Sequence, residues 1–262
     1  MTEVSAFDVL AADYDEQFTT SLVGREQRRV TRKWLSRVLA GQNNLQILEI
    51  NCGTGDDASW LSEMGHYVTA TDQSPAMIAK AKQKAVGPEF ITCAFDELEE
   101  KFNDRQFDLI FSNFAGLNCV SPDQLKILGN QLHRLIKPGG HFAAVIFGKF
   151  CLWETAYYLS KGRRREAFRR RTANEVHARL DDTTHQTIYY YSVKQFTENL
   201  PFKRKQTRPI GLFVPPSYLE GAMKKHPRLF RLLVKMEDSF AGFAAARSLS
   251  DHTWLLFKKK MI

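Results

Sequence analysis

The hydrophobic positions in the first half of the chain alternate between two patterns. Short apolar runs, which indicate buried strands, are separated by longer segments in which apolar residues recur every three or four positions, as in amphipathic helices. The runs predict strands at 47–50, 67–71, 90–95, 107–113 and 141–147, and the longer segments predict a short helical lead-in over 5–20 and helices at 22–40, 57–64, from Pro75 onward and at 122–136. Because parallel strands are joined by helices, this alternation predicts a mostly parallel sheet with helices on both faces.

The pattern changes after residue 148. Residues 149–180 are typical of helix and contain no strand-like run. Residues 149–186, with 217–247 as a second candidate, resemble insertions on the ligand side of the sheet. The remaining chain predicts a strand-like or pocket-lining segment at 187–192, a short helix at 193–200, a strand at 202–213, a helical region at 217–247 broken around Pro227, and a last strand at 252–259. We expect one domain, with N-terminal helices and the ligand-binding half in residues 1–148, and a helical insertion or lid plus the remaining strands in residues 149–262.

The net charge of +8 is unevenly distributed between these two parts. Residues 1–148 contain 14 Lys and Arg against 19 Asp and Glu, whereas residues 149–262 contain 23 against 10. The second part should therefore meet an acidic partner first. Charge alone leaves open whether that partner is nucleic acid, an anionic membrane surface, an acidic carrier protein or a phosphorylated small molecule.

The composition argues against several classes of protein. No apolar run approaches the roughly 18 residues of a membrane-spanning helix. The N-terminus has acidic residues and no basic segment, which argues against a signal peptide. The four cysteines are widely spaced and lack the spacing of a metal site, so we expect reduced thiols in a cytoplasmic protein with no bound metal.

The strand at 47–50 leads into a turn with two glycines, Gly53 and Gly55, before the next helix begins. Together these form a nucleotide cradle, because the missing Cβ atoms let the backbone approach a ligand and free N–H groups face it. Two acidic residues flank this turn, since Glu49 precedes it and Asp72 ends the next predicted strand. Dinucleotide enzymes use a similar turn, so the turn alone does not identify the ligand.

Four segments in a fixed order narrow the choice of ligand. They read Leu-Glu-Ile-Asn-Cys-Gly-Thr-Gly from Leu48, Thr-Asp-Gln-Ser-Pro-Ala-Met-Ile from Thr71, Phe-Asp-Leu-Ile-Phe-Ser-Asn from Phe107, and Leu-Ile-Lys-Pro-Gly-Gly from Leu135. Together they resemble class I S-adenosylmethionine-dependent methyltransferases, and among these the small-molecule enzymes related to the ubiquinone and menaquinone C-methyltransferases. The resemblance covers residues 44–148. It implies a Rossmann-like α/β fold, a seven-stranded and mostly parallel sheet with helices on both faces, an antiparallel last strand and a helical insertion after the fifth strand.

The resemblance implies that S-adenosylmethionine is the cofactor and S-adenosylhomocysteine the product. It places Asp72 against the ribose hydroxyls, Met77 against the adenine ring, and Asn113 with Phe114 near the reactive methyl group. Tyr14 matches an N-terminal tyrosine that closes over the cofactor in many relatives. The expected cofactor-binding residues are Tyr14, Glu49, Asn51, Cys52, Gly53, Gly55, Asp72, Gln73, Met77, Phe95, Asp96, Asn113 and Phe114.

The chain departs from the family pattern at three places. Asn51 stands where relatives usually have the first glycine of the turn, and since Asn tolerates positive φ, we expect a left-handed backbone there with a side chain added to the pocket. Ala94 stands where an aspartate often holds the adenine amino group, which leaves Asp96 or the backbone N–H of Phe95 for that contact. Residues 112–115 differ from Asn-Pro-Pro-Tyr, the pattern of enzymes that methylate planar amino groups of adenine or glutamine.

The residues that could assist the chemistry or contact an acceptor are less well defined. His185 and His133 are the histidines to test as a base, and Asn118 is either an acceptor-orienting residue or, more simply, a structural loop amide. The tyrosines at 189–191 could line an apolar pocket or pack in the core. The arginine cluster at 163–171 could be a solvated or regulatory face, a site for an acidic carrier or a lipid surface, or an RNA contact.

These patterns predict methyl transfer to a small, apolar or aromatic acceptor, which could be carried by another protein. Aromatic residues make 149–186 and 210–247 the candidate lid. Placing the acceptor in line in a dry pocket can supply most of the rate, so a missing catalytic triad does not argue against an enzyme. Two alternatives remain: an RNA methyltransferase that uses the basic second part, although no separate RNA-binding module is visible, and a protein that binds the cofactor without catalysis. The acceptor, the attacked atom and the oligomeric state do not follow from the sequence.

Overall fold

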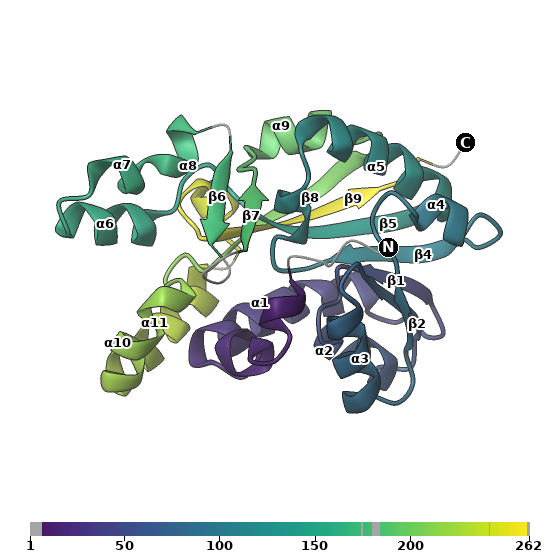
Figure 1. Cartoon of the computed structure of the whole chain (residues 1–262), viewed down its shortest axis with the longest axis horizontal. Coiled ribbons are helices and arrows are strands. Elements are labelled where there is room, and N and C mark those ends of the chain that lie inside the picture. The colour runs from purple at the N-terminus through teal and green to yellow at the C-terminus, as the bar shows by residue number, and fades with distance from the viewer. Residues whose placement is uncertain (1–6, 174, 180–183, 241, 261–262) are drawn as a thin grey trace.

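A seven-stranded sheet organises the molecule (Figure 1). The computed structural model describes residues 7–173, 175–179, 184–240 and 242–260. The strand order is β3-β2-β1-β4-β5-β9-β8, in which β1 to β5 run parallel and β9 runs antiparallel between β5 and β8. The strands are β1 Gln46–Ile50, β2 Tyr67–Asp72, β3 Glu89–Thr92, β4 Phe107–Ser112, β5 Ile136–Phe147, β8 Lys203–Ile210 and β9 His252–Lys258. The predicted Rossmann-like sheet, with its antiparallel last strand, is confirmed.

Helices cover both faces of this sheet, as the alternating pattern predicts. In Figure 1, α1, α2 and α3 lie on one side of the sheet, and α4, α5 and α9 lie on the other. The helices are α1 Leu22–Leu39, α2 Asp56–Glu63, α3 Pro75–Lys84, α4 Leu98–Lys101, α5 Pro122–Leu135, α6 Leu152–Ser160, α7 Arg164–Ala167, α8 Arg169–Thr172, α9 Val193–Glu198, α10 Glu220–Lys225 and α11 Pro227–Phe240. Shorter helical turns occur at Asp8–Leu10, Asp15–Thr19, Gly116–Cys119, Ser217–Leu219 and Ala244–Ser248.

Local caps determine where two of the helices begin. The Ser74 hydroxyl accepts a hydrogen bond from the Met77 N–H at 3.1 Å, and Pro75 occupies the first position of α3, so this predicted cap is confirmed. Ser121 forms a capping box with Gln124 at the start of α5. These caps satisfy N–H groups that have no partner inside the helix.

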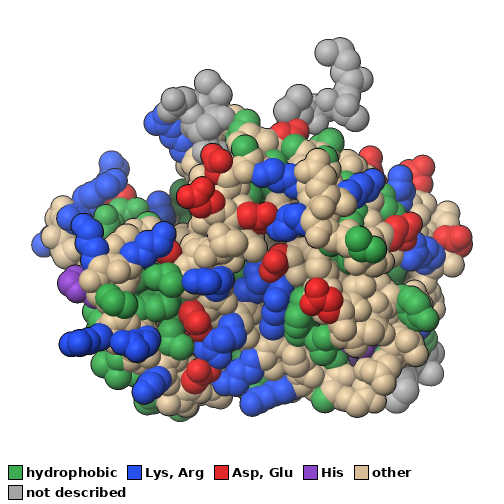
Figure 2. All heavy atoms as spheres, turned by 90° about the horizontal axis from the view of Figure 1, so that it is seen from below, with side chains coloured by type: hydrophobic (Ala, Val, Ile, Leu, Met, Phe, Trp, Pro, Cys, Tyr) green, Lys and Arg blue, Asp and Glu red, His purple; other side chains and the backbone are tan. Residues whose placement is uncertain are grey.

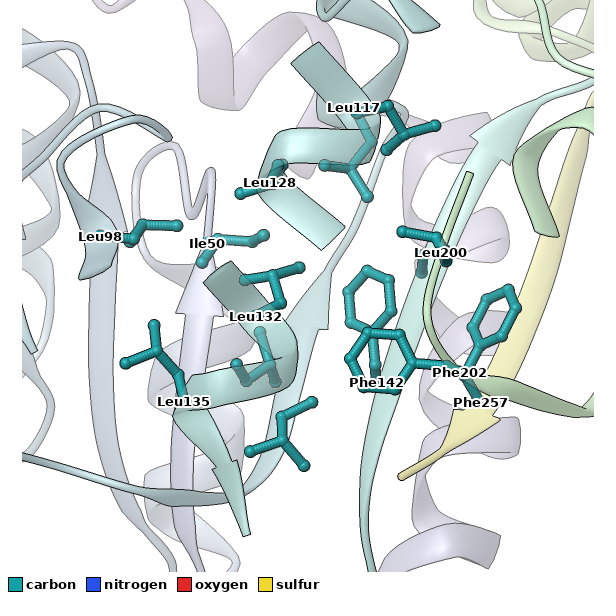
Figure 3. Packing of buried hydrophobic residues seen from close by; sticks show 14 of the residues in the cluster. Ile50, Leu98, Leu117, Leu128, Leu132, Leu135, Phe142, Leu200, Phe202 and Phe257 are labelled. Carbon is teal, nitrogen blue, oxygen red and sulfur yellow. The ribbon is translucent and has the colours of Figure 1, made fainter. Parts of the chain in front are cut away.

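The strands are apolar on both faces because each face packs against helices. On one face, Ile47 of β1 packs in a cluster with Trp34 of α1. On the other face, leucines of α5 lie over the sheet beside aromatic rings from β5, from β9 and from Phe202, just before β8. Figure 3 shows this second cluster with the labelled side chains Ile50, Leu98, Leu117, Leu128, Leu132, Leu135, Phe142, Leu200, Phe202 and Phe257. With both faces covered, the carboxyl edge of the parallel strands is left for a ligand.

Residues 149–180 are not entirely helical, contrary to the prediction. Helices α6, α7 and α8 are followed by β6 Val176–Arg179, which pairs antiparallel with β7 His185–Ile188 in a separate two-stranded sheet. β6 has four residues that alternate between half-buried and exposed, a run too short to stand out after the arginines. The segment predicted at 187–192 is strand only as far as Ile188.

Two further differences concern β5 and α4. β5 begins at Ile136, before the predicted start at His141, because the backbone through 138–140 continues alongside β4, with an irregularity between Phe107 and Leu109. The sequence pattern does not indicate α4, a helix of only four residues.

Three general features of the described residues bear on function. No helix among them is long and apolar enough to cross a membrane. They contain no group of three or more His, Cys, Asp and Glu side chains arranged to hold a metal ion. The four cysteines, Cys52, Cys93, Cys119 and Cys151, are free thiols.

Candidate active site

A large cavity lies at the carboxyl edge of the parallel strands. Its volume is about 970 Å³, and residues from both halves of the chain line it. We call its first chamber the part lined by residues that follow β1, β2, β3 and β4 and by N-terminal residues between Phe7 and Phe18, and its second chamber the remaining part. The second chamber lies between the end of β5, the start of β9, the β6–β7 hairpin and residues 216–218. A cavity of this size accommodates a cofactor together with a small molecule.

The turn after β1 has a left-handed backbone at Asn51, Gly53 and Gly55, with φ values of 55°, 54° and 79°. The left-handed conformation predicted for Asn51 is confirmed. Its side chain turns toward the end of β4, where Oδ1 accepts a hydrogen bond from Ser112 Oγ at 2.6 Å and Nδ2 donates to the Asn113 carbonyl oxygen at 2.8 Å. The asparagine thus joins two parallel strands at their carboxyl ends, which a glycine could not do.

Asp72 closes this turn from the end of β2. Its carboxylate accepts hydrogen bonds from the backbone N–H groups of Gly53 and Ser74, each at 2.9 Å. The residue is 9% exposed and lines the cavity. Burial raises the pKa of its carboxyl group, against the opposite effect of the two N–H donors. A buried acceptor is therefore held beside the turn, where it can receive hydroxyl donors from a ligand.

Asp57, in the first turn of α2, collects donors from two other elements. Arg28 Nη1 and Arg32 Nε lie 2.5 Å and 2.8 Å from its two carboxylate oxygens. Asn113 Nδ2 donates a hydrogen bond to Asp57 Oδ2 at 2.7 Å. Burial acts to raise the pKa of Asp57, but the two arginines and Asn113 hold it below its ordinary value. The sequence pattern gives no signal that distinguishes these two arginines from the other basic residues of their helix.

Glu49 is buried beside this network without a complete set of partners. It is 2% exposed, and within the described structure its Oε2 has no hydrogen-bond partner. Burial, and then the nearby charge of Asp57, raise the pKa of Glu49 well above its ordinary value. An incompletely paired carboxyl group that lines a cavity is complementary to a ligand that brings an ammonium group.

The N-terminal segment covers the glycine turn. A Cβ atom at Gly53 would lie 3.4 Å from Tyr14 Cε1, so the phenol ring rests directly on the turn. Burial raises the pKa of Tyr14 to about 12, which keeps its hydroxyl protonated at neutral pH. Asp15 fastens the segment, because its Oδ1 accepts a hydrogen bond from Thr54 Oγ1 at 2.6 Å and its Oδ2 lies 2.7 Å from Lys84 Nζ.

Nearly all of the expected cofactor-binding residues are brought together in the first chamber. Gln73 and Met77 line it after β2, and Phe95 and Asp96 line it after β3. Gly55 does not line it, because this glycine lies behind the turn against the Phe90 ring. The residues from the expected set that do line the cavity are Tyr14, Glu49, Asn51, Cys52, Gly53, Asp72, Gln73, Met77, Phe95, Asp96, Asn113 and Phe114.

Aromatic rings form much of the second chamber. The centre of the Phe147 ring lies 4.4 Å from that of His252 and 6.2 Å from that of Tyr190. Phe114, which follows β4, lies 6.1 Å from the His252 ring and so stands between the two chambers. Tyr218 lines the outer wall. His252 and these rings therefore lie where a second molecule would meet the ligand of the first chamber.

A buried group of charged side chains lies beside His252, although within the described residues the His252 Nδ1 makes no hydrogen bond. Asp251 Oδ2 lies 3.2 Å from His252 Nδ1, and Arg170 Nη2 lies 2.8 Å from Asp251 Oδ1. Arg170 also pairs with Glu154 at 2.8 Å, and Arg169 meets the other oxygen of Glu154 at 2.9 Å. Burial acts to raise the pKa of Asp251, but His252 and Arg170 lower it well below its usual range.

The arginine cluster at 163–171 is therefore divided. Arg170 is 6% exposed, and it lines the cavity together with Arg169. Arg164 and Arg165 of α7 remain exposed. The cluster does not lie on one helix, because Phe168 separates two short helices, and Glu154 pairs with arginines of the second.

Comparison with known proteins identifies the family. A model described as a methyltransferase domain matches residues 47–140, from β1 into β5. This segment belongs to the methyltransferase-domain family, and it is similar to the class I S-adenosylmethionine-dependent methyltransferases. A demethylmenaquinone methyltransferase from Staphylococcus epidermidis is 34% identical over 140 residues, which are 52% of this chain and 56% of that protein.

Other relatives of the chain are named for different activities. A malonyl-(acyl-carrier protein) O-methyltransferase from Pectobacterium atrosepticum is 27% identical over 144 residues, which are 52% of this chain and 55% of that protein. The chain spans about half the length of the curated relatives it matches. A solved DhpI–SAH complex has the same fold, with a TM-score of 0.58 and 18% identity over 99% of this chain and 96% of that chain.

The residues suggested for chemistry do not line the cavity. His133 lies on α5, with its ring 5.3 Å from the Phe202 ring. His185 is exposed at the start of β7. Asn118 is fully buried, and its Nδ2 donates a hydrogen bond to the Tyr189 carbonyl oxygen at 2.6 Å, as a structural loop amide does.

Among the described histidines, His252 lines the cavity, and the sequence pattern did not indicate it. The position of His252 in the sequence could have indicated its place in the cavity. It is the first residue of an antiparallel strand, and such a residue lies at the carboxyl edge of the parallel strands beside it. Of the three tyrosines at 189–191, Tyr190 lines the cavity, whereas the Tyr191 hydroxyl is buried and donates to the Val120 carbonyl oxygen. Tyr190 thus lines a cavity, whereas Tyr191 packs in the core.

Proposed function

We propose that this chain transfers a methyl group from S-adenosylmethionine to a small, apolar or aromatic acceptor. The observation that supports this most strongly is the continuity of the cavity, which joins Asp72 and the glycine turn to the aromatic chamber around Phe147. Methyl transfer requires the acceptor atom in line with the transferred methyl group and shielded from water. Two adjoining chambers of this kind meet both requirements.

The first chamber has groups complementary to each part of the cofactor. Asp72 would accept the ribose hydroxyls, Met77 would pack against the adenine ring, and Tyr14 would cover the bound molecule. Glu49 would accept a hydrogen bond from the ammonium group of the cofactor. This bond would give Glu49 Oε2 the partner that it lacks. When bound, the cofactor supplies a methyl group made electrophilic by the attached sulfonium.

The second chamber favours a neutral acceptor. The guanidinium groups of Arg169 and Arg170 are matched by the carboxylates of Glu154 and Asp251, so they offer no free positive charge to an acidic molecule. The rings around them favour a phenol or a reduced quinone. The demethylmenaquinone methyltransferase among the relatives supports the same acceptor class.

His252 would take the proton from such an acceptor. Its Nδ1 is buried beside Asp251, so Nε2 would be the ring nitrogen that meets the acceptor. Asp251 is itself fixed by Arg170 and by Gln27, whose Nε2 donates to Asp251 Oδ2 at 3.3 Å. An imidazole held in this way can accept a hydroxyl proton as the oxygen attacks the methyl group.

The β6–β7 hairpin and residues 216–218 would form the lid over the acceptor, since both line the second chamber. A carrier-borne acceptor is the second candidate, because a malonyl-(acyl-carrier protein) O-methyltransferase is among the relatives. The free cysteines support a cytoplasmic location. We do not propose RNA as the acceptor, because the two arginines nearest the cavity are held by carboxylates.

Calorimetric titration tests the cofactor site, and a methyl-release assay tests the transfer. The wild-type chain should bind S-adenosylmethionine and S-adenosylhomocysteine, and Asp72→Asn should weaken both by about tenfold or more. With phenols and hydroquinones as acceptors, methyl release should depend on the wild-type chain. Binding without release on any of them would indicate a cofactor-binding protein, and absence of binding would refute the proposal.

A further inference from the structure

The outer face of α11 carries large apolar side chains that the proposed chemistry does not use. Leu229, Leu232 and Phe240 are 45%, 55% and 46% exposed, and Phe243, just beyond the helix, is 59% exposed. Figure 2 shows hydrophobic side chains lying among Lys and Arg over α10 and α11, at the left of the view. Exposed apolar groups that gather in this way mark a contact surface.

Basic residues border this apolar row. Lys225, Arg228, Arg231 and Lys235 are exposed, and no ion pair within the described ranges engages them. The last three are spaced by three and four positions, so they form a second row along α11 beside the leucines. The outer face of the helix is thus amphipathic in its own right, with one apolar and one cationic stripe.

The acidic residues of α10 and α11 bind partners in other segments of the chain and do not lie among the exposed cations. Glu220 accepts hydrogen bonds from two backbone N–H groups at the start of α1, both at 2.9 Å. Glu237 is buried and accepts from backbone N–H groups between Gly211 and Val214. Asp238 pairs with Arg29 of α1 at 3.1 Å. The positive charge of the outer face is therefore not balanced by acids of its own helices.

We infer that α10 and α11 dock onto an anionic lipid bilayer through this face. Leucine and phenylalanine side chains enter the boundary between headgroups and acyl chains, while lysine and arginine meet the phosphate groups. The unbalanced positive charge selects an anionic bilayer over a neutral one. A symmetric contact with a second copy of this chain would instead bring the same cations together.

The face adjoins the mouth of the second chamber. Tyr218, in the turn that leads into α10, is 43% exposed and also lines the cavity. Its ring lies 5.1 Å from that of Tyr157 on α6, a helix that exposes Leu159 at 43%. Docking would hold the chamber beside the bilayer, so that an apolar acceptor could enter from the lipid. This last consequence rests on the proposed methyl transfer, whereas the docking does not.

Flotation of the full chain with lipid vesicles tests the inference. Vesicles of phosphatidylcholine mixed with phosphatidylglycerol should carry the protein upward, vesicles of phosphatidylcholine alone should not, and added salt should release it. Leu229→Ser combined with Leu232→Ser should weaken binding to the mixed vesicles by about tenfold or more. Arg228→Gln combined with Arg231→Gln should weaken it by a similar factor.

Two matched controls remove similar groups elsewhere. Val86→Ser removes an exposed apolar side chain before β3, and Lys203→Gln with Lys205→Gln removes two exposed cations from β8, so neither should change vesicle binding. Calorimetry with S-adenosylhomocysteine shows separately that each variant is folded and has its cofactor site. The inference is overturned if mixed vesicles do not bind the wild type, if the controls lose as much as the α11 variants, or if light scattering shows a dimer that the double leucine variant dissociates.

Discussion

Arg28 and Asp57 form an ion pair at 2.5 Å in which the side chains are only 10% and 2% exposed. Arg32 meets the same carboxylate, so removing the Asp57 carboxylate would leave both guanidinium groups with only the more exposed Asp56 as an acidic neighbour. Breaking a buried pair in this way exposes the full cost of a buried charge. Asp57→Ala should therefore lower the free energy of unfolding by about 3–5 kcal/mol, measured by urea denaturation.

The matched control for this variant is Asp238→Ala. Asp238 pairs with Arg29, but here the side chains are 39% and 40% exposed, so solvent screens the pair. Its loss should cost less than about 1 kcal/mol. Equal losses for the two variants would show that burial does not distinguish the two carboxylates.

Asn51 and Gly116 occupy adjoining space, and a double-mutant cycle can detect this. A Cβ atom at Gly116 would lie 2.4 Å from Asn51 Cγ, so Gly116→Ala should displace the asparagine side chain from Ser112 and cost about 2–3 kcal/mol. In an Asn51→Gly background the same change should cost less than about 1 kcal/mol. Additive effects in denaturant unfolding would contradict the placement of this side chain.

Alanine substitutions at Gly55 and Gly41 distinguish the cost of backbone strain from the cost of overpacking. Their φ values are similar, 79° and 74°, but a Cβ atom at Gly55 would lie 2.6 Å from the Phe90 ring, whereas at Gly41 it would meet nothing within 4 Å. Gly41→Ala should therefore cost about 1 kcal/mol from strain alone, and Gly55→Ala about 2–4 kcal/mol. Thermal unfolding measures both, and a similar loss for each would mean that Phe90 moves aside without cost.

Glu49→Gln should stabilise the protein increasingly as the pH rises above about 4.5. The pKa of Glu49 is raised in the folded state by burial and by Asp57, from an ordinary value of 4.5. The folded chain thus keeps a proton that the unfolded chain releases near that value. The resulting stability is fully present below the unfolded pKa and is lost as the pH rises through the folded pKa.

Urea unfolding of the wild type and of Glu49→Gln across this pH range measures the effect. The difference between the two free energies should be smallest near the unfolded pKa and grow toward neutral pH. A difference that does not change with pH would mean that Glu49 ionises as readily in the folded chain as in the unfolded one.

His252→Asn tests the proposed proton acceptor. Transfer to a phenol that is neutral at the assay pH should fall by about a hundredfold or more, whereas an acceptor such as 4-nitrophenol, largely ionised at mildly alkaline pH, should lose much less. The calorimetric affinity for S-adenosylmethionine should not change. His133→Asn makes the same substitution outside the cavity and should leave transfer intact. An equal loss with both acceptors would rule out proton transfer to His252.

The sheet, the helix caps and the glycine turn follow from local patterns, which is why they could be predicted. Ser74 and Pro75 mark the start of α3 through neighbouring residues alone, and Asn51 was placed by its tolerance of positive φ. The first chamber was predictable because its residues follow strand ends, which meet at one edge of a parallel sheet.

The second chamber could not be predicted in this way, because its residues meet only through tertiary contacts. Arg170 and Asp251 are 81 positions apart and come from a short helix and a strand end that share no local pattern. Arginines beside one another in the sequence suggested a single exposed surface. The buried carboxylate of Glu154, on another helix, determines which of them turn inward.

The position of β9 has a consequence for synthesis on the ribosome. β5 and β8 have no common neighbour until residues 252–258 emerge, and Trp254 and Phe257 of that strand are fully buried in the finished core. While the chain that follows β5 is translated, β5 can pair with β4 but its other edge stays open, and open edges of this kind attract wrong strands. Chaperones that meet the growing polypeptide would find their longest-lived target at β5.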